Sequence, residues 1–164
     1  MSIKSDLKEG LQPLFRALRE GHSALELARS RAQQIDSAIL SLWERANPGP
    51  LTLLAVGGYG RGEVYPQSDV DLLVIIDEDS PTQALSEFIQ SLWDLGLDVG
   101  HAVRTWNECS EEASKDISTA TAMLEARVLM GDPSSADRLS KLVSDTWDER
   151  AFFEAKRAEQ VERH

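Results

Sequence analysis

The chain has 164 residues, of which 41% are hydrophobic, and its 17 basic and 28 acidic side chains give a formal net charge of −11. This length allows one domain with a sizeable core, and the hydrophobic content excludes a disordered chain. The negative field repels phosphate backbones, so a broad nucleic-acid-binding surface is disfavoured.

The compartment is suggested by the single cysteine, Cys109, which cannot form an internal disulfide. A lone thiol favours a reducing, cytoplasmic setting. The first ten residues lack the apolar core of a signal peptide, and no apolar stretch reaches the ~18 to 20 residues of a membrane span. We therefore expect a soluble cytoplasmic protein that binds neither membranes nor nucleic acid.

Two helices are expected in the N-terminal third. The first lies within residues 4–20. In residues 23–46, apolar side chains recur at spacings of three and four, which is typical of a helix. Ser23 and Glu26 have the spacing of a capping box at its start, and Asn-Pro-Gly-Pro at 47–50 ends it.

Three strands and a helix are expected in the middle of the chain. Residues 51–56 are short, apolar and bounded by proline and glycine, as in a buried strand. Residues 69–76 and 97–105 alternate in the way of strands. Between them, residues 82–96 are predicted to be a helix.

The remainder is predicted to be helical. We expect helices at roughly 107–114, at 117–130 closed by Gly131, at 134–147 and from 148 to the end. The final helix has no stop signal, so the chain is expected to be a fragment of a longer protein. The pattern predicts an α/β (α+β) fold in which a small mixed sheet is flanked by helices and followed by a helical region.

A glycine-rich turn follows the first predicted strand, with the sequence Gly-Gly-Tyr-Gly-Arg-Gly at residues 57–62. Glycines let the backbone adopt positive φ and approach a ligand closely. Exposed N–H groups at such a turn bind phosphate oxygens. The alternative is a plain turn, since glycine-rich turns are common.

Two aspartates, Asp69 and Asp71, lie on the same face of the second predicted strand because side chains alternate along a strand. Two ionised carboxylates at this spacing repel each other and lose hydration, which costs several kcal/mol unless a cation lies between them. Mg²⁺ fits that role, since it prefers carboxylate oxygens and shares its other positions with water and phosphates. The alternative is that Asp69 caps a turn and Asp71 lies on an exposed edge.

Together these features resemble a known family. The segment 57–75 resembles the signature of the DNA polymerase beta-like nucleotidyltransferase superfamily, in which a glycine-led turn and a short helix precede an Asp-x-Asp strand. The segments 92–105 and 116–132 are similar to the N-terminal nucleotidyltransferase domain of bacterial PII uridylyltransferase/uridylyl-removing enzymes. The likeness spans roughly residues 51–132. It implies N-terminal helices at 1–50, a nucleotidyltransferase core at 51–106 and a helical extension at 107–164.

The resemblance implies a nucleotide site. Gly57 and Gly58 would hold the triphosphate, together with Arg61 and Ser68. The superfamily usually has Gly-Ser at this turn, so a hydroxyl contact to phosphate is missing here, and Arg61 or the backbone replaces it. Arg61 and Arg104 can equally neutralise the acidic cluster.

The resemblance also implies a metal site. Asp69 and Asp71 would be catalytic metal ligands for Mg²⁺, and similar enzymes carry a third carboxylate on a neighbouring strand. Asp98 is the candidate for that third ligand, on a predicted face that also carries small residues, and it can double as general base. Asp94 and Glu63 are rivals for the position.

For function, the resemblance implies transfer of UMP from UTP to a tyrosine of the PII signal protein, with release of pyrophosphate. One alternative keeps the fold and transfers another nucleotide, such as an adenylyl group, to a different acceptor. Another is a non-catalytic nucleotide-binding or interaction module. Similar enzymes continue into a phosphohydrolase domain of the HD type and ACT domains, which this sequence lacks, so we expect uridylyl removal and glutamine sensing to be absent and isolated activity to be weak.

Overall fold

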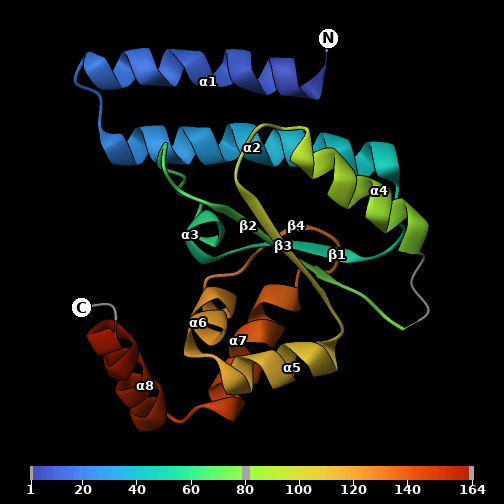
Figure 1. The fold of residues 1–164 in the computed structure, drawn as a ribbon, viewed down its shortest axis with the longest axis vertical. Coiled ribbons are helices and arrows are strands. Elements are labelled where there is room, and N and C mark those ends of the chain that lie inside the picture. The colour runs from blue at the N-terminus through green and yellow to red at the C-terminus, as the bar shows by residue number, and fades with distance from the viewer. Residues whose placement is uncertain (1, 79–81, 163–164) are drawn as a thin grey trace.

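A four-stranded sheet lies between two layers of helices in the computed structural model, which describes residues 2–78 and 82–162. Helices α2 and α4 cover one face of the sheet, with α1 packed on the outer side of α2, and α5, α6 and α7 cover the other face (Figure 1). The elements in chain order are α1 (Ile3–Arg19), α2 (Ala24–Ala46), β1 (Thr52–Val56), α3 (Gly57–Gly60), β2 (Val70–Ile75), α4 (Thr82–Trp93), β3 (Val99–Arg104), α5 (Trp106–Lys115), α6 (Ile117–Leu124), β4 (Arg127–Met130), α7 (Ser135–Thr146) and α8 (Glu149–Glu162).

The sheet has the strand order β3-β2-β1-β4. Strand β1 is antiparallel to both of its neighbours, β2 and β4, whereas β2 and β3 are parallel. The sheet is therefore mixed, which confirms the predicted fold class. The three strands predicted from alternation correspond to β1, β2 and β3, with ends that differ by one or two residues.

Alternation along the strands divides the core between the two faces. One face packs against α2 and α4, and α1 extends this core from the outer side of α2; the other face packs against α5, α6 and α7. The first face carries Leu53, Ala55, Leu72 and Val74, and the second carries Leu54, Leu73 and Ile75.

The two N-terminal helices match their predictions. Helix α1 continues through Pro13, because a proline removes one backbone donor without ending a helix that packs along its length on α2. Helix α2 begins after Ser23, whose hydroxyl accepts a hydrogen bond from the backbone N–H of Glu26 at 3.4 Å. It ends at Ala46, before the predicted breaker segment.

The helix predicted at 117–130 is wrong in its second half. Helix α6 ends at Leu124, and the chain then forms the outer strand β4, which pairs with β1. A short apolar segment fits a helix or a strand equally well, and here pairing satisfies the free edge of β1. Gly131 follows this strand at a φ of +111°, where a Cβ would lie 2.7 Å from the carbonyl oxygen of Leu51.

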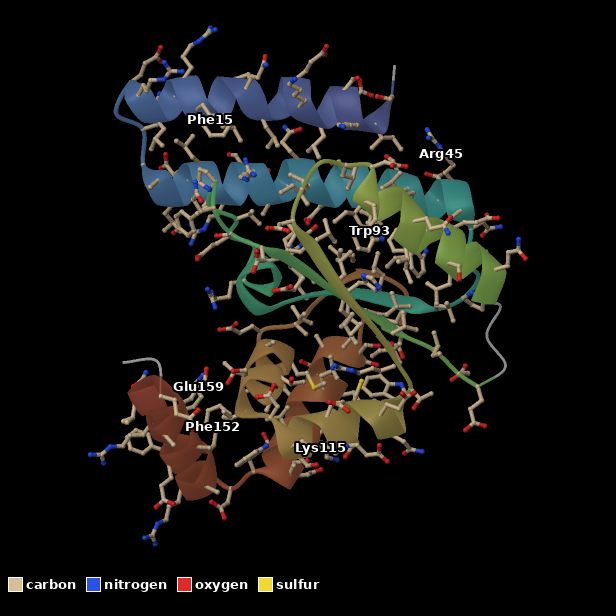
Figure 2. All side chains as sticks on the ribbon, in the orientation of Figure 1. Phe15, Arg45, Trp93, Lys115, Phe152 and Glu159 are labelled. Carbon is tan, nitrogen blue, oxygen red and sulfur yellow. The ribbon has the colours of Figure 1, made fainter. Side chains whose placement is uncertain are left out.

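Helix α8 has no fully buried residue. Phe152 packs against the second core, and Glu159 accepts a hydrogen bond from the hydroxyl of Ser118 on α6 at 2.9 Å. Figure 2 shows both side chains on the side of α8 that faces α6. Across the described residues, every helix is too short or too polar to cross a bilayer.

Candidate functional site

The glycine bend lies at the end of β1. The chain leaves Val56, adopts a φ of +63° at Gly57 and enters the four-residue helix α3. Val56 pairs with Asp71 across the sheet, and a Cβ placed on Gly57 would lie 3.7 Å from the Oδ2 atom of Asp71. The bend and the second aspartate are therefore neighbours.

Asp71 occupies an interior strand. Val56 on β1 flanks it on one side and Gly100 on β3 flanks it on the other. Its side chain shares a face with Leu73 and Ile75, as alternation predicted. Unlike them, Asp71 lies near the end of that face, where it is exposed to solvent. The alternative that placed Asp71 on an edge strand is wrong, because β2 has a partner on each side.

The charge of this aspartate pair is uncompensated. Burial raises the pKa of Asp71, and the negative charge of Asp69 raises it further. Although Asp71 contacts solvent, the flanking strands remove part of its hydration. Within residues 2–78 and 82–162, neither carboxylate has a hydrogen bond or an ion pair. The pair consequently favours a bound cation.

A cleft opens beside Asp71, between the sheet and α6. Its volume is about 280 Å³, which is close to the lower end of small-molecule sites. The cleft is open to solvent, so a ligand longer than the cavity can extend out of it. Its lining includes Asp71, Gly100, Ala102 and Arg104 from the sheet and Thr119 and Met123 from α6.

Gly100 is the residue directly beside Asp71 on β3. A Cβ at this position would lie 2.6 Å from the Oδ1 atom of Asp71, so the aspartate carboxylate occupies the space that a side chain would fill. The small residues expected on this face of β3 therefore do line the cleft. Part of the room that they leave is used by Asp71 itself.

Asp98, the predicted third carboxylate, lies beside the start of β2. Its backbone carbonyl accepts a hydrogen bond from the N–H of Val70 at 2.9 Å. Its side chain is exposed. Over the two described ranges, no three His, Cys, Asp or Glu side chains converge closely enough to hold an ion. The role of Asp98 as a metal ligand stays a prediction.

The two rival carboxylates differ in position, because Asp94 lies on the opposite face of the sheet and Glu63 lies beside the glycine bend. Asp94 lines a pocket with Lys4 and Leu42, between α1, α2 and α4 on the opposite face of the sheet. Glu63 lies 4.0 Å from the Nε atom of Arg61. The geometry therefore removes Asp94 from the set of possible ligands for an ion held by Asp71.

The predicted phosphate-binding side chains flank the bend. Arg61 caps the end of α3, and its Nη1 atom donates to Oε1 of Glu125 at 2.6 Å. Its Nη2 atom would lie 3.4 Å from a Cβ placed on Gly58. The hydroxyl of Ser68 accepts a hydrogen bond from the backbone N–H of Tyr65 at 3.2 Å, which closes the turn before the aspartates.

Sequence reasoning missed a polar network that fixes α3. The side chain of Tyr59 is 1% exposed, and its hydroxyl donates to Oδ1 of Asp36 on α2 at 2.5 Å. Arg127 on β4 donates to Asp36 through both Nη atoms, at 2.7 and 3.1 Å, and to the carbonyl oxygen of Tyr59 at 3.1 Å. This network ties the glycine helix to α2 and β4.

The network is centred on the ion pair of Asp36 and Arg127, while the buried Nε atom of Arg127 has no hydrogen-bond partner among the described residues. Burial raises the pKa of Tyr59, and its hydrogen bond to Asp36 adds to this effect. For Arg127, burial opposes the charge, but the hydrogen bond and the charge of Asp36 outweigh it and raise the pKa. The available sequence signal was the position of Asp36 on α2, four residues after Ala32 and three before Ile39 on the apolar stripe.

Comparisons with known proteins identify the family of the chain. A family model described as a nucleotidyltransferase domain matches residues 35–121, a range that contains the glycine bend and both aspartates. The bifunctional uridylyltransferase/uridylyl-removing enzyme of Nitrosospira multiformis is 37% identical over 173 residues, which cover 99% of this chain and 20% of that protein. Its counterpart in Haemophilus influenzae is 41% identical over 152 residues, covering 87% of this chain and 18% of that protein.

A third relative, the enzyme of the same description from Acinetobacter baylyi, is 38% identical over 98% of this chain and 18% of that protein. The chain thus spans about a fifth of the length of the curated relatives it matches. A solved structure, a toxin–antitoxin crystallised with AMP-PNP, covers 77% of this chain and 95% of its own, with a TM-score of 0.44 and 19% identity.

Proposed function

The chain belongs to the nucleotidyltransferase domain family, and on this basis we propose that it transfers UMP from UTP to a tyrosine hydroxyl of the PII signal protein, releasing pyrophosphate. One observation carries the proposal. Asp71 on β2 has no hydrogen bond or ion pair with a described residue, it lies beside the glycine bend, and the negative charge of Asp69 raises its pKa. The choice of UMP as the transferred group is supported by the names of the relatives, which are uridylyltransferase/uridylyl-removing enzymes.

The aspartates fit a divalent cation. Asp69 and Asp71 carry charges that repel each other and that no described group balances. Oxygen donors of this kind, open to solvent, suit Mg²⁺. When bound, Mg²⁺ supplies positive charge to the triphosphate and to the departing pyrophosphate. We assign Asp69 and Asp71 as its ligands and keep Asp98 as the proposed third.

The bend is the proposed phosphate-binding element. The backbone N–H groups of Gly57 and Gly58 supply donors without side chains in the way. Arg61 supplies a fork of donors beside Gly58, and Ser68 lies in the turn that precedes Asp69. Together they would hold the triphosphate next to the two carboxylates.

In the proposed reaction, the oxygen of the acceptor tyrosine attacks the α-phosphorus of UTP. A new P–O bond forms to the tyrosine as the bond from the α-phosphorus to the pyrophosphate oxygen breaks. The hydroxyl proton passes to water or to a nearby carboxylate such as Asp98. The cleft beside α6 is open to solvent, which allows a protein acceptor to reach Asp71.

Transfer of labelled UMP from UTP to purified PII, in the presence of Mg²⁺, tests the proposal. We expect labelling by this chain and none by the Asp71→Asn variant. Labelling that persists in the variant would remove Asp71 from the chemistry. A thermal-shift titration with UTP and ATP tests the base, since the preferred nucleotide raises the melting temperature more.

A second candidate function is a non-catalytic nucleotide-binding module. It is favoured by the finding that no three potential metal ligands converge in the part of the chain that the structure describes. Binding of UTP with Mg²⁺, but no labelling of PII by this chain or by longer versions that include the rest of the protein, would support the module.

A further inference from the structure

An ion pair joins the ends of α3 and α6 beside the glycine bend. Arg61 caps α3, Glu125 caps α6, and their side chains meet at 2.6 Å between Nη1 and Oε1. The side chains are 52% and 27% exposed, so water and ligands can reach both. A competing anion can therefore break the ion pair between Arg61 and Glu125.

The guanidinium of Arg61 lies between Glu125 and the glycine bend. Its Nη1 atom is held by Glu125, while its Nη2 atom lies over Gly58, 3.4 Å from the position of a Cβ. A Cβ placed on the adjacent Gly57 would lie 3.7 Å from the Oδ2 atom of Asp71. In the described part of the chain, Nη2 has no hydrogen-bond acceptor. One edge of the guanidinium is therefore open toward the bend.

We propose that Glu125 is a latch, which holds Arg61 in the nucleotide-free chain and gives it up to the triphosphate of a bound nucleotide. The inference rests on the proposed function in one respect, that the bend binds a triphosphate. A phosphate group offers Arg61 more negative charge than one carboxylate and the same bidentate geometry. Glu125 thus competes with the ligand and lowers its apparent affinity.

The packing of α6 on α3 does not depend on the Glu125 side chain. A Cβ on Gly60 would overlap the carbonyl oxygen of Glu125, so the two helices meet through backbone atoms. A substitution at position 125 keeps this backbone contact and removes only the carboxylate. The latch can consequently be tested without disturbing the backbone contact between α3 and α6.

The test is a double-mutant cycle read out as the dissociation constant of UTP with Mg²⁺, by calorimetry. Exposed ion pairs are weak, so Glu125→Gln should tighten UTP binding by about two- to five-fold. Arg61→Gln should weaken binding. In the Arg61→Gln background, Glu125→Gln should give no further tightening, because no arginine remains to be released.

A matched control is Glu63→Gln, which removes the same charge from a carboxylate 4.0 Å from the Nε atom of Arg61. We expect a smaller effect than that of Glu125→Gln. Equal tightening in the control, or undiminished tightening in the Arg61→Gln background, would mean that Glu125 acts by simple repulsion and would overturn the latch. Glu125→Ser repeats the measurement if Glu125→Gln does not fold, as judged by circular dichroism.

Failure of the latch can be distinguished from failure of the proposed function. Tripolyphosphate with Mg²⁺ serves as a probe that lacks a base and a sugar. If the unmodified chain binds neither UTP, ATP nor tripolyphosphate, the triphosphate site is wrong and the latch falls with it. If the chain binds UTP and Glu125→Gln leaves the dissociation constant unchanged, only the latch is overturned.

Discussion

Two acidic sites flank the glycine helix α3, and they differ in whether neighbouring groups compensate their negative charge. Asp36 is bonded to Tyr59 and Arg127, and its side chain is only 22% exposed. Asp71 is exposed, has no hydrogen bond or ion pair to a described residue, and lies beside a second negative charge. One carboxylate completes the fold, and the other is the proposed cation ligand.

The comparison separates stability from function within one small region. Removing a paired carboxylate leaves its partners without a hydrogen bond or an ion pair, which lowers the free energy of unfolding. Removing an unpaired carboxylate leaves no protein group without a partner, so the change weakens ligand binding and not folding.

The largest expected effect is on activity. Asp71→Asn should lower nucleotidyl transfer by about a thousand-fold or more, because it removes a charge that the site needs for its cation. The folded-state pKa of Asp71 lies above its usual value of 3.8, so its ionised form costs stability at any higher pH. The variant should consequently melt at the same temperature or higher, as measured by calorimetry at pH 7.

Asp94→Asn is the control for this prediction, since it removes the same charge on the opposite face of the sheet. It should retain full activity. A loss of activity in Asp94→Asn, or a clear drop in the melting temperature of Asp71→Asn, would contradict the assignment of Asp71 as the unpaired carboxylate.

The second effect is on stability. Asp36→Ala should lower the free energy of unfolding by about 2 to 4 kcal/mol, because Arg127 and the Tyr59 hydroxyl lose their partner in a mostly buried site. Urea unfolding measures this loss. The double variant Asp36→Leu with Arg127→Met removes both charges and should be more stable than either single change. A double variant that is less stable than both would show that the pair is not a unit.

The contrast between the two sites also explains what the sequence could predict. The faces of β2 and β3 follow from alternation within each strand, so Asp71 and Gly100 were placed on the correct face from local pattern alone. The glycine bend is equally local, since its residues adjoin the end of β1. These features need only the chain near them.

The features that the sequence did not reveal join distant segments. Arg127 lies 91 residues from Asp36 in the chain, and Arg61 lies 64 residues from Glu125. The strand β4 forms because the edge of β1 offers unpaired backbone groups. The segment after α6 does not specify this pairing by itself. Pairings of this kind depend on the assembled sheet, and one sequence does not specify them.

A third prediction tests the space beside Asp71. Gly100→Ala places a Cβ 2.6 Å from the Oδ1 atom of Asp71, so the carboxylate must move. Misplacement by a fraction of an ångström should lower activity by about ten-fold. Stability should change by less than about 1 kcal/mol, because the displaced atom is the end of a solvent-exposed side chain.

Gly10→Ala on α1 is the matched control, since its Cβ would also lie 2.6 Å from a side-chain oxygen, Oε1 of Gln34, at a position that does not line the cleft. It should leave the transfer rate within about two-fold, a threshold below typical losses from displaced catalytic groups. Unchanged activity in Gly100→Ala would show that the position of Asp71 tolerates displacement, and the proposed ion geometry would be wrong.

The smallest effect concerns a group that is neither paired nor exposed. Burial raises the pKa of the Cys109 thiol from 9.0 to about 11, with a smaller opposing contribution from Arg104. The folded state therefore holds this proton more tightly than the unfolded state, and stability should fall as the pH rises from about 9 through about 11. The variant Cys109→Ala should lack this component, which the difference between the two unfolding curves isolates from other groups.

The same burial predicts slow chemistry at Cys109. At pH 8 the native chain should react with iodoacetamide far more slowly than the urea-unfolded chain, because the thiol is neutral and inaccessible. Rapid labelling of the native chain would mean that α5 opens readily. Charge is thus suppressed at Cys109 and paired at Asp36, whereas Asp71 has no ion pair with a described residue and lies beside the like charge of Asp69, as expected of the proposed cation ligand.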